Sequence, residues 1–303
     1  MRIGLRHIRH FVVVADELHF RRAAEQLGIA QPALSRSIRY LERELDVTLF
    51  RRSNRSVEIT PAGRVFLKGC RTILNSVDRT VDSARLAHLG QLGSIRIGYT
   101  DNAITGVLPR LLKDFQTRQP KIVIKIHHDV TSAQLTKLAE RELDVGFVTG
   151  PIGLSGFEQC LIQSERFVCV VYETHRLAKR RSIRLEELAD EDFVHGLPTY
   201  WEHFYSYLIP LCRKSGFAPK IIQEAFNTAS IMGLVASGMG ITILTENIRN
   251  SIGPGLVVIP VEDVSEKLQT VAVWKSDSVD GPMQHFLTFL RDMAAADHPI
   301  SSR

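Results

Sequence analysis

The chain has 303 residues, of which 44% are hydrophobic and 23% are charged, so a mostly disordered protein is excluded and about two folded domains are expected. It has no apolar run near 18 residues and no secretory signal, so we expect a cytoplasmic protein that does not interact with membranes. Its four cysteines form no C-x-x-C pair, which argues against a disulfide framework and against a zinc finger.

The positive charge is concentrated in the first third of the chain. Residues 1–92 contain 16 Lys and Arg against 9 Asp and Glu, a net charge of +7, whereas residues 93–303 contain 22 against 24, a net charge of −2. This asymmetry indicates a polyanion-binding module joined to a second domain. A solvated basic surface would have the same composition, so the order of the residues has to decide between the two interpretations.

Three helices are predicted for residues 5–18, 20–27 and 32–45. Gly28 provides a turn between the second and third helices, because glycine readily adopts a positive φ angle. Pro32 lies in the first turn of the third helix, where a missing N–H group costs little. Two helices joined by a tight glycine turn are typical of a helix-turn-helix, whose second helix binds in the major groove of double-stranded DNA.

The side chains expected to contact DNA lie on the third helix and on a following hairpin. Gln can pair with adenine and Arg with guanine, whereas Ser suits a phosphate. Short strands at residues 49–50 and 57–59 flank a basic tip and predict a wing. The candidate DNA-binding residues are Gln31, Pro32, Ser35, Arg36 and Arg39 on the helix, and Arg52 and Arg55 in the wing. Each alone is compatible with an ordinary exposed residue, but their combination favours nucleic-acid binding.

A long helix is predicted for residues 61–89, with Thr60 as its N-cap. An apolar stripe follows it through Phe66, Cys70, Ile73, Val77, Val81, Ala84 and His88. Such a stripe needs a partner, which is either the helix's own domain or a second copy of the chain. Helix-turn-helix proteins commonly bind two half-sites as dimers, which favours the second copy and a dyad operator. Cys70 is interpreted as a core residue rather than a redox sensor.

The segment "AAEQLGIAQPALSRSIRYLERELDVTLFRR", followed by "ITPAG", resembles the N-terminal domain of LysR-type transcriptional regulators. The resemblance covers the whole chain and implies that the long helix pairs two subunits in a homodimer or homotetramer. RNA polymerase is then a candidate partner. Ala30 departs from the family pattern, which often has Ser or Thr as a helix cap at this position, and the missing cap would cost about 1 kcal/mol.

The remainder of the chain alternates predicted strands and helices, which favours α/β lobes with parallel strands. The segment "LVASGMGITIL" is similar to part of the second lobe of the family's effector-binding domain. The predicted fold class is therefore α/β, with a winged helix-turn-helix and a long linker helix followed by a two-lobed, periplasmic-binding-protein-like effector domain. The expected boundaries are 1–60 for the DNA-binding domain, 61–92 for the linker helix and hinge, and 93–303 for the effector domain, with lobe I at about 93–162 and 267–303 and lobe II at about 163–266.

Polar residues follow the predicted strands, where α/β sheets bind ligands and where helix N-termini suit anions. The resemblance matches Asn102, Thr131 and Phe204 to effector-contacting positions in the family branch that senses aromatic-catabolism intermediates. A small organic or aromatic carboxylate is the expected effector, although Asp101 opposes an anion unless it points away or pairs with a cation. The candidate effector-binding residues are Thr100, Asn102, Thr131, Ser132, His195, Phe204 and Thr228. The alternative for each hydroxyl is a helix cap.

Motifs for catalysis, including G-x-S-x-G, H-E-x-x-H and G-x-x-x-x-G-K-[ST], do not occur, so no enzymatic activity, cofactor or metal is expected. His127 and His128 precede Asp129, but neighbouring side chains on a strand point to opposite faces, which opposes a metal site. An exported solute-binding protein would need a signal peptide and no basic N-terminal domain. An enzyme fused to a DNA-binding domain would need a catalytic constellation. The sequence therefore favours a ligand-responsive transcriptional regulator.

Overall fold

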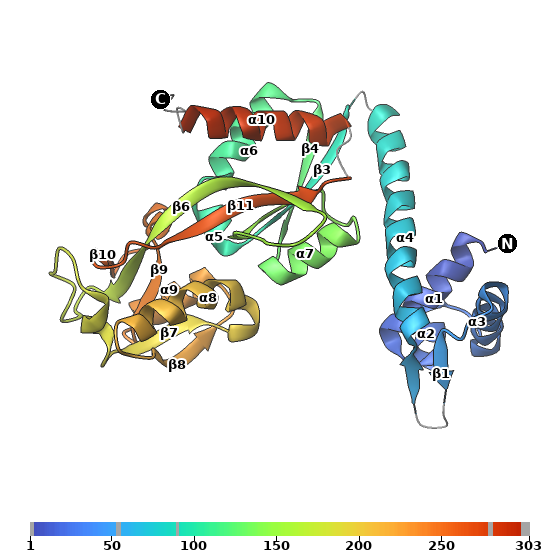
Figure 1. The fold of residues 1–303 in the computed structure, drawn as a ribbon, viewed down its shortest axis with the longest axis horizontal. Helices are drawn as coiled ribbons and strands as arrows, with labels where there is room; N and C mark the ends of the chain where they lie inside the picture. Colours follow the sequence, from blue (N-terminus) through green and yellow to red (C-terminus); the bar gives the residue numbers. More distant parts are fainter. Residues whose placement is uncertain (1–2, 53–55, 89–90, 278–280, 298–303) are drawn as a thin grey trace. The chain divides into compact units, whose positions relative to one another are not determined.

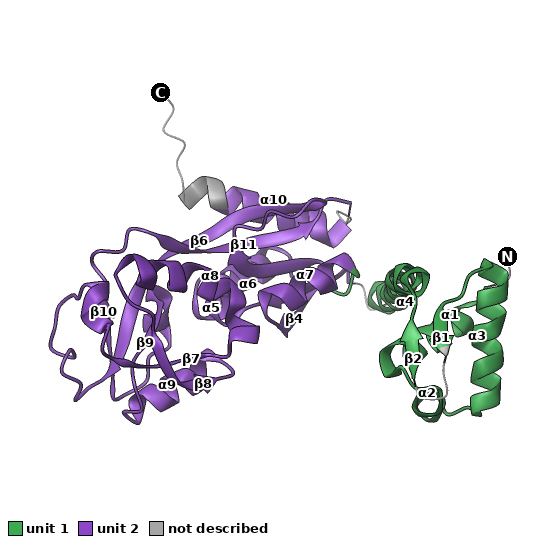
Figure 2. Cartoon of the chain, turned by 60° about the horizontal axis from the view of Figure 1, so that its bottom comes forward, with its two compact units in different colours: residues 1–89, 140–142 green, residues 90–139, 143–303 purple. Residues whose placement is uncertain are grey.

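The computed structural model describes residues 3–52, 56–88, 91–277 and 281–297. The chain divides into two compact units, residues 1–89 with 140–142 and residues 90–139 with 143–303, which Figure 2 distinguishes by colour. Within the described ranges, no helix is long and apolar enough to cross a membrane.

The first unit begins with three short helices, α1 (Leu5–Glu17), α2 (Phe20–Leu27) and α3 (Gln31–Leu45). Gly28 ends α2 with a φ of 65°, and its N–H group bonds back to the last turn of the helix. The predicted glycine turn of the helix-turn-helix is therefore confirmed. The N-cap of α3 is Ala30, whose side chain makes no capping hydrogen bond, as the sequence predicts.

A small hairpin follows, formed by the antiparallel strands β1 (Phe50–Arg52) and β2 (Val57–Ile59). Its first residue packs into the core of the helices, because the Phe50 ring lies 5.3 Å from the ring of Phe11 and 6.1 Å from that of Phe20. The hairpin is the predicted wing, and its base is part of the same apolar core as α1, α2 and α3.

The long helix α4 (Pro61–His88) starts where the sequence predicts. The backbone N–H of Gly63 donates to Thr60 Oγ1 over 2.9 Å, so Thr60 caps this helix. The apolar stripe divides into two parts. Cys70 is buried in the core of the first unit, whereas Ile73 and Val81 are 44% and 43% exposed in the single chain. Only the first part of the stripe therefore packs within its own unit.

The second unit contains two lobes, and lobe I is built on a sheet in which β3 pairs in parallel with β4 on one side and β5 on the other. Helices α6 and α10 cover one face of this sheet, and α7 covers the opposite face (Figure 1). The elements are β3 (Gly93–Tyr99), α5 (Asp101–Thr105), α6 (Leu108–Arg118), β4 (Ile122–His128), α7 (Thr131–Ala139), β5 (Val145–Gly150) and α10 (Gly281–Asp297). The predicted parallel strands of this lobe are confirmed.

Two long antiparallel strands, β6 (Phe157–Tyr172) and β11 (Lys267–Lys275), join the lobes. The first part of β6 pairs with β11, and from Phe167 onward it pairs with strands of lobe II, so one strand belongs to both lobes (Figure 1). The sequence interpretation did not predict these two antiparallel strands. Residues 157–166 are exposed or half-buried, whereas residues 167–171 are all buried, so no single pattern marks residues 157–172 as one strand.

Lobe II contains a second layer of strands and helices around two apolar clusters of its own. Strands β9 and β10 pair with β6, and β7 pairs in parallel with β8. The elements are η1 (Leu185–Leu188), β7 (Asp192–Gly196), α8 (Pro198–Lys214), β8 (Lys220–Ala225), α9 (Thr228–Ala236), β9 (Thr242–Thr245), η2 (Glu246–Asn250) and β10 (Leu256–Pro260).

Candidate DNA-binding surface and effector cavity

Helix α3 buries one face and exposes the other. Leu34, Ile38 and Leu41 are fully buried, which fixes the orientation of the helix in the first unit. The opposite side carries the predicted DNA-binding residues. Gln31, Pro32, Arg36 and Arg39 are exposed and Ser35 is half-buried. Positions three and four apart lie on the same side of a helix, so these five residues form one continuous polar surface that starts at the helix N-terminus.

The wing is held to α3 by a residue that the sequence interpretation missed. Glu42 Oε1 accepts hydrogen bonds from the backbone N–H groups of Leu49 and Phe50, at 3.0 and 3.2 Å. A charged residue on a helix looks like an ordinary surface position, so no local signal marks this contact. Of the two predicted wing arginines, Arg52 contributes its backbone to β1, while its side chain and all of Arg55 lie outside the described residues.

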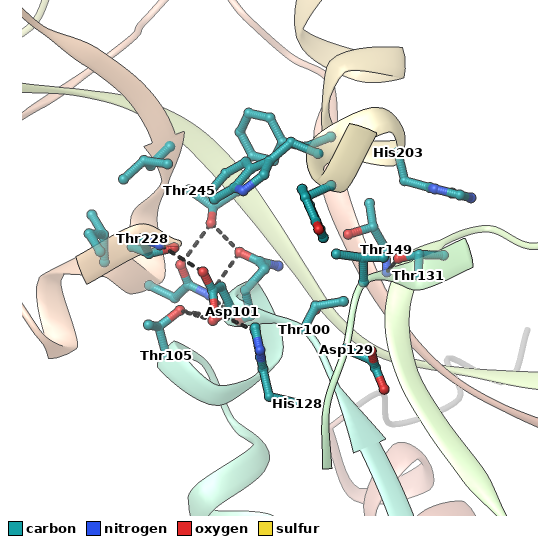
Figure 3. Close-up of a pocket in the computed structure, with 18 of the residues that line it drawn as sticks. Thr100, Asp101, Thr105, His128, Asp129, Thr131, Thr149, His203, Thr228 and Thr245 are labelled. Atoms are coloured by element: carbon teal, nitrogen blue, oxygen red, sulfur yellow. Dashed lines mark hydrogen bonds and ion pairs between the residues drawn. The ribbon is translucent and has the colours of Figure 1, made fainter. Parts of the chain in front are cut away.

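A cavity with an empty volume of about 630 Å³, part of it open to solvent, lies between the two lobes of the second unit (Figure 3). Its walls differ in chemistry, because the four phenyl, phenol and indole rings all come from lobe II, whereas both lobes contribute threonine hydroxyl groups. The residues that define these walls are Thr100, Thr131 and Thr149 from lobe I, and Tyr200, Trp201, Phe204 and Phe226 from lobe II.

Thr131 is the best-placed hydroxyl of the cavity. It opens α7, is 4% exposed, and its Oγ1 accepts a hydrogen bond from the backbone N–H of Thr149 over 3.2 Å. This bond uses a lone pair of the oxygen and leaves the hydroxyl proton available for a ligand. Thr100 has a structural task as well, since it caps α5 by accepting from Ala103 N at 3.4 Å. The hydroxyl of Thr100 therefore serves as a helix cap, which was the alternative to a role in effector binding.

Asp101 is placed between the lobes rather than toward open solvent. Its Oδ2 accepts from the backbone N–H of Thr228 at the start of α9, over 2.7 Å. Its Oδ1 lies 2.8 Å from Nε2 of His128, the last residue of β4 (Figure 3). The sequence interpretation left open whether Asp101 pairs with a cation. The structure places its carboxylate between an imidazole and a helix N-terminus, both of which favour a negative charge.

Asn102 lines the cavity, but its side chain is engaged by the protein itself. Its Nδ2 donates to Thr270 Oγ1 over 2.9 Å, and its Oδ1 accepts from the hydroxyl of Thr245 in lobe II. Asn247 Nδ2, also in lobe II, donates to the backbone oxygen of Asn102 over 2.8 Å. Asn102 therefore connects the two lobes, and these contacts limit what it can offer a ligand.

Two of the predicted effector-binding residues, His195 and Ser132, do not line the cavity. His195 is fully buried, its Nε2 lies 3.1 Å from the backbone oxygen of Ile243, and Gly196 N–H donates to its Nδ1 over 2.9 Å. Burial lowers the pKa of His195 to about 4, so its imidazole is neutral and donates through Nε2. Ser132 is exposed on α7. The remaining five candidates, Thr100, Asn102, Thr131, Phe204 and Thr228, all line the cavity.

The aromatic wall is the part of the cavity that the sequence interpretation missed, apart from Phe204. Trp201 and Tyr200 lie in the first turn of α8, and the Tyr200 ring packs 4.5 Å from that of Phe226. Trp201 lies directly over Gly196, where a Cβ atom would come within 2.1 Å of its ring. The run "TYWEHFYSY" carries aromatic residues at helical spacing and is the signal that could have indicated this wall.

The described residues contain no group of three or more His, Cys, Asp or Glu side chains that could hold a metal ion. Cys70 and Cys212 are buried, and burial raises the pKa of each thiol to about 12. Both thiols are therefore protonated, and the interpretation of Cys70 as a core residue is confirmed.

A winged helix-turn-helix with an exposed polar face, and a separate unit with a cavity between two lobes, define a DNA-binding protein with a ligand-binding domain. Residues 5–64 match the family described as "Bacterial regulatory helix-turn-helix protein, lysR family", and residues 88–295 match the "LysR substrate binding domain". The chain belongs to the LysR family of transcriptional regulators and is a DNA-binding regulator rather than an enzyme.

The sequences of known regulators are similar to this chain over nearly its whole length. The regulator AlsR of Bacillus subtilis (strain 168) is 30% identical over 283 residues, which cover 93% of this chain and 94% of AlsR. YnfL of Escherichia coli (strain K12), an uncharacterized regulator, is 33% identical over 297 residues, or 96% of this chain and 100% of YnfL.

The crystal structure of CbnR, a LysR family transcriptional regulator, has the same fold as this chain. Its TM-score is 0.74 at 23% identity, and the match covers 96% of this chain and 99% of CbnR. Full-length CbnR in complex with its target DNA gives a TM-score of 0.72 at 22% identity, with the same coverage.

Proposed function

We propose that this regulator is controlled by a small organic acid, aromatic or of similar size, which binds in the cavity between the lobes. The observation that carries the proposal is that the four aromatic rings of the cavity all come from lobe II, whereas threonine hydroxyls line both sides. Hydroxyl groups can donate to a carboxylate, and rings can pack against an apolar body.

The carboxylate is best accommodated at the first turn of α7. Helix N-termini carry N–H groups without intrahelical partners and a partial positive charge, which stabilise anions. The Thr131 hydroxyl belongs to this turn and has a proton to donate. Lys and Arg are missing from the described residues that line the cavity, which leaves hydroxyl, backbone and imidazole groups to hold the carboxylate. The apolar part of the acid would then lie against Trp201 and Phe204.

A thermal-shift screen of small aliphatic and aromatic carboxylates tests this proposal, because a ligand that binds the folded state raises the unfolding temperature. For a confirmed ligand, Thr131→Val keeps the shape of the side chain and removes the hydroxyl. We expect binding, measured by calorimetry, to weaken by about 1.5–3 kcal/mol. Ser132→Ala is the matched control, since Ser132 follows on the same helix but does not line the cavity. Equal affinity of Thr131→Val and the unmodified protein would place the carboxylate elsewhere.

For DNA recognition, we propose that α3 enters the major groove and that Gln31, Ser35, Arg36 and Arg39 make the contacts there, with Pro32 fixing the start of the helix. Their placement on one exposed face supports this assignment. Arg52 and Arg55 are proposed to contact the DNA backbone from the wing. Double-stranded DNA with two half-sites is the proposed operator.

We further propose that the exposed part of the α4 stripe pairs two chains, in a homodimer or in a tetramer of two dimers. Ile73 and Val81 are large apolar side chains left exposed in the single chain. Ile73→Asp or Val81→Asp would place a charge in the paired interface and is expected to dissociate the chains in light scattering. Ser83→Asp adds the same charge to another side of α4 and is expected to leave the assembly intact. A monomer in the unmodified protein would contradict this proposal.

A further inference from the structure

Asp101 occupies a position where a ligand's negative charge would otherwise be stabilised. The first N–H group of α9, that of Thr228, donates to Asp101 Oδ2 over 2.7 Å. A second donor of this turn is also used, because Ser230 N–H donates to Asn227 Oδ1 over 2.9 Å. Helix α9 therefore faces the cavity with its N-terminus already covered by a carboxylate of lobe I, and this bonded carboxylate shows that the position accepts an anion.

The charges around the cavity do not favour a second ligand anion at this end. The carboxylate and imidazole side chains among its described lining residues are Asp101, Asp129, His128 and His203. Asp129 forms an ion pair with Lys137, and His128 is paired with Asp101. A further carboxylate near α9 would meet the like charge of Asp101, which already accepts from the first N–H group of the helix. The end of the cavity at Thr131 is different, because its hydroxyl proton is unused.

We propose that Asp101 is a specificity-determining residue that restricts the cavity to acids with a single carboxylate. This inference rests on the proposed organic-acid effector. The single carboxylate binds at Thr131, and the uncharged remainder of the molecule extends along the aromatic wall toward Asp101. In Figure 3, Thr131 and Thr149 lie on one side of the cavity, and Asp101 with Thr228 lies on the other. A dicarboxylate bound in this orientation would direct its second charge at Asp101.

Matched pairs of acids test the inference directly. Benzoate with terephthalate, hexanoate with adipate, and crotonate with fumarate differ within each pair by one carboxylate. Dissociation constants from ligand-observed NMR titrations of the full chain give the ratio of dicarboxylate to monocarboxylate affinity for each pair. The unmodified protein is expected to prefer the monocarboxylate in every pair that binds.

Two substitutions separate the effects of charge and of the hydrogen bond. Asp101→Ala removes the charge and uncovers Thr228 N–H, and it is expected to shift the affinity ratio toward the dicarboxylate by about tenfold or more. Asp101→Asn keeps an acceptor for this N–H group and removes only the charge, so a smaller shift is expected. Asp129→Asn removes a charge from the same cavity without uncovering α9, and it serves as the matched control. Denaturant unfolding of the second unit, followed by circular dichroism, confirms that each variant is folded.

The outcomes distinguish the two proposals. An unchanged ratio in both Asp101 variants, while the monocarboxylates still bind, overturns the role of Asp101 and leaves the organic-acid effector intact. The same conclusion follows if Asp129→Asn shifts the ratio as far as Asp101→Ala, or if the unmodified protein prefers the dicarboxylates. If none of the six acids binds the unmodified protein or its Asp101 variants, the organic-acid effector itself is wrong, and this inference falls with it.

Discussion

The DNA-binding surface and the effector cavity are assembled in opposite ways. The proposed base-reading residues come from one helix of 15 consecutive residues, whose fully buried face determines which side remains exposed. The cavity draws its lining from residues between Thr100 and Ile248, on elements of both lobes. The comparison shows that a site on a single helix follows from local periodicity, whereas a site between two lobes depends on contacts that are distant in the sequence.

The two units also differ in whether their ionisable side chains are exposed to solvent or paired and buried. The first unit carries the excess of arginines, and Arg36 and Arg39 are exposed. The second unit pairs Asp101 with His128 at the cavity and keeps His195 neutral in its core. Binding to DNA should therefore depend strongly on salt, because each phosphate contact releases counterions, whereas the stability of the second unit should depend on pH.

The largest expected effect concerns the buried imidazole of His195. Burial lowers its pKa from 6.5 to about 4, so between these values the unfolded chain binds a proton that the folded chain does not. The free energy of unfolding should therefore fall as the pH is lowered from 6.5 to 4, by about 3 kcal/mol from this residue, and His195 should add no further loss below pH 4. Denaturant unfolding of the second unit across this range measures the loss.

His195→Gln is the matched variant for this experiment, because glutamine is not ionisable and its Nε2 can donate to the backbone oxygen of Ile243. The variant should lose less stability than the unmodified protein over the same pH range. An identical pH dependence in the two proteins would show that other groups determine the acid sensitivity of the second unit, and the proposed contrast with the first unit would lose its main support.

A smaller effect is expected from Arg36 on the recognition surface. If this side chain makes a bidentate contact with guanine, Arg36→Ala should weaken binding to the operator by about 1–3 kcal/mol and should relax the base preference at one position. Arg43→Ala removes the same charge from the same helix, but Arg43 lies in its last turn and over the ring of Tyr40. Titrations with operator and with base-substituted DNA separate the two variants. A loss that is uniform over all DNA sequences would mean that Arg36 contacts phosphate only.

The smallest effect is a gain in stability at the start of α3. Ala30 has the extended backbone of an N-cap, but its methyl group cannot accept a hydrogen bond from the first turn. Ala30→Ser should raise the free energy of unfolding of the first unit by about 1 kcal/mol. Ala33→Ser introduces the same hydroxyl inside the helix and should give no such gain. A decrease in the stability of Ala30→Ser would show that its hydroxyl cannot adopt the capping geometry.

Much of the architecture could be predicted from the sequence because it depends on local order. The glycine turn at Gly28, the cap at Thr60 and the parallel strands of lobe I follow from residue types and from periodicity over a few positions. The long strand β6 could not be predicted in this way. Its two halves pair with different strands, so its pattern of burial changes midway along the strand.

The predicted site residues show the same division. His195 and Thr131 both look like polar residues at strand or helix ends, and the sequence does not distinguish them. The fold places Thr131 in the wall of the cavity and His195 in the core beside Ile243. Glu42 was overlooked for a related reason, since its role depends on backbone N–H groups that the folded hairpin brings within reach.

The sequence by itself determined the class of the protein, the three helices of the DNA-binding domain and the face of α3 that is exposed, because helical periodicity and charge act over short distances. The tertiary structure decided which polar groups line the cavity and that Asp101 reaches the N-terminus of α9, 127 positions away along the chain. Such contacts depend on how the two lobes are joined through β6 and β11, and a local pattern of residues carries no information about distances between segments so far apart.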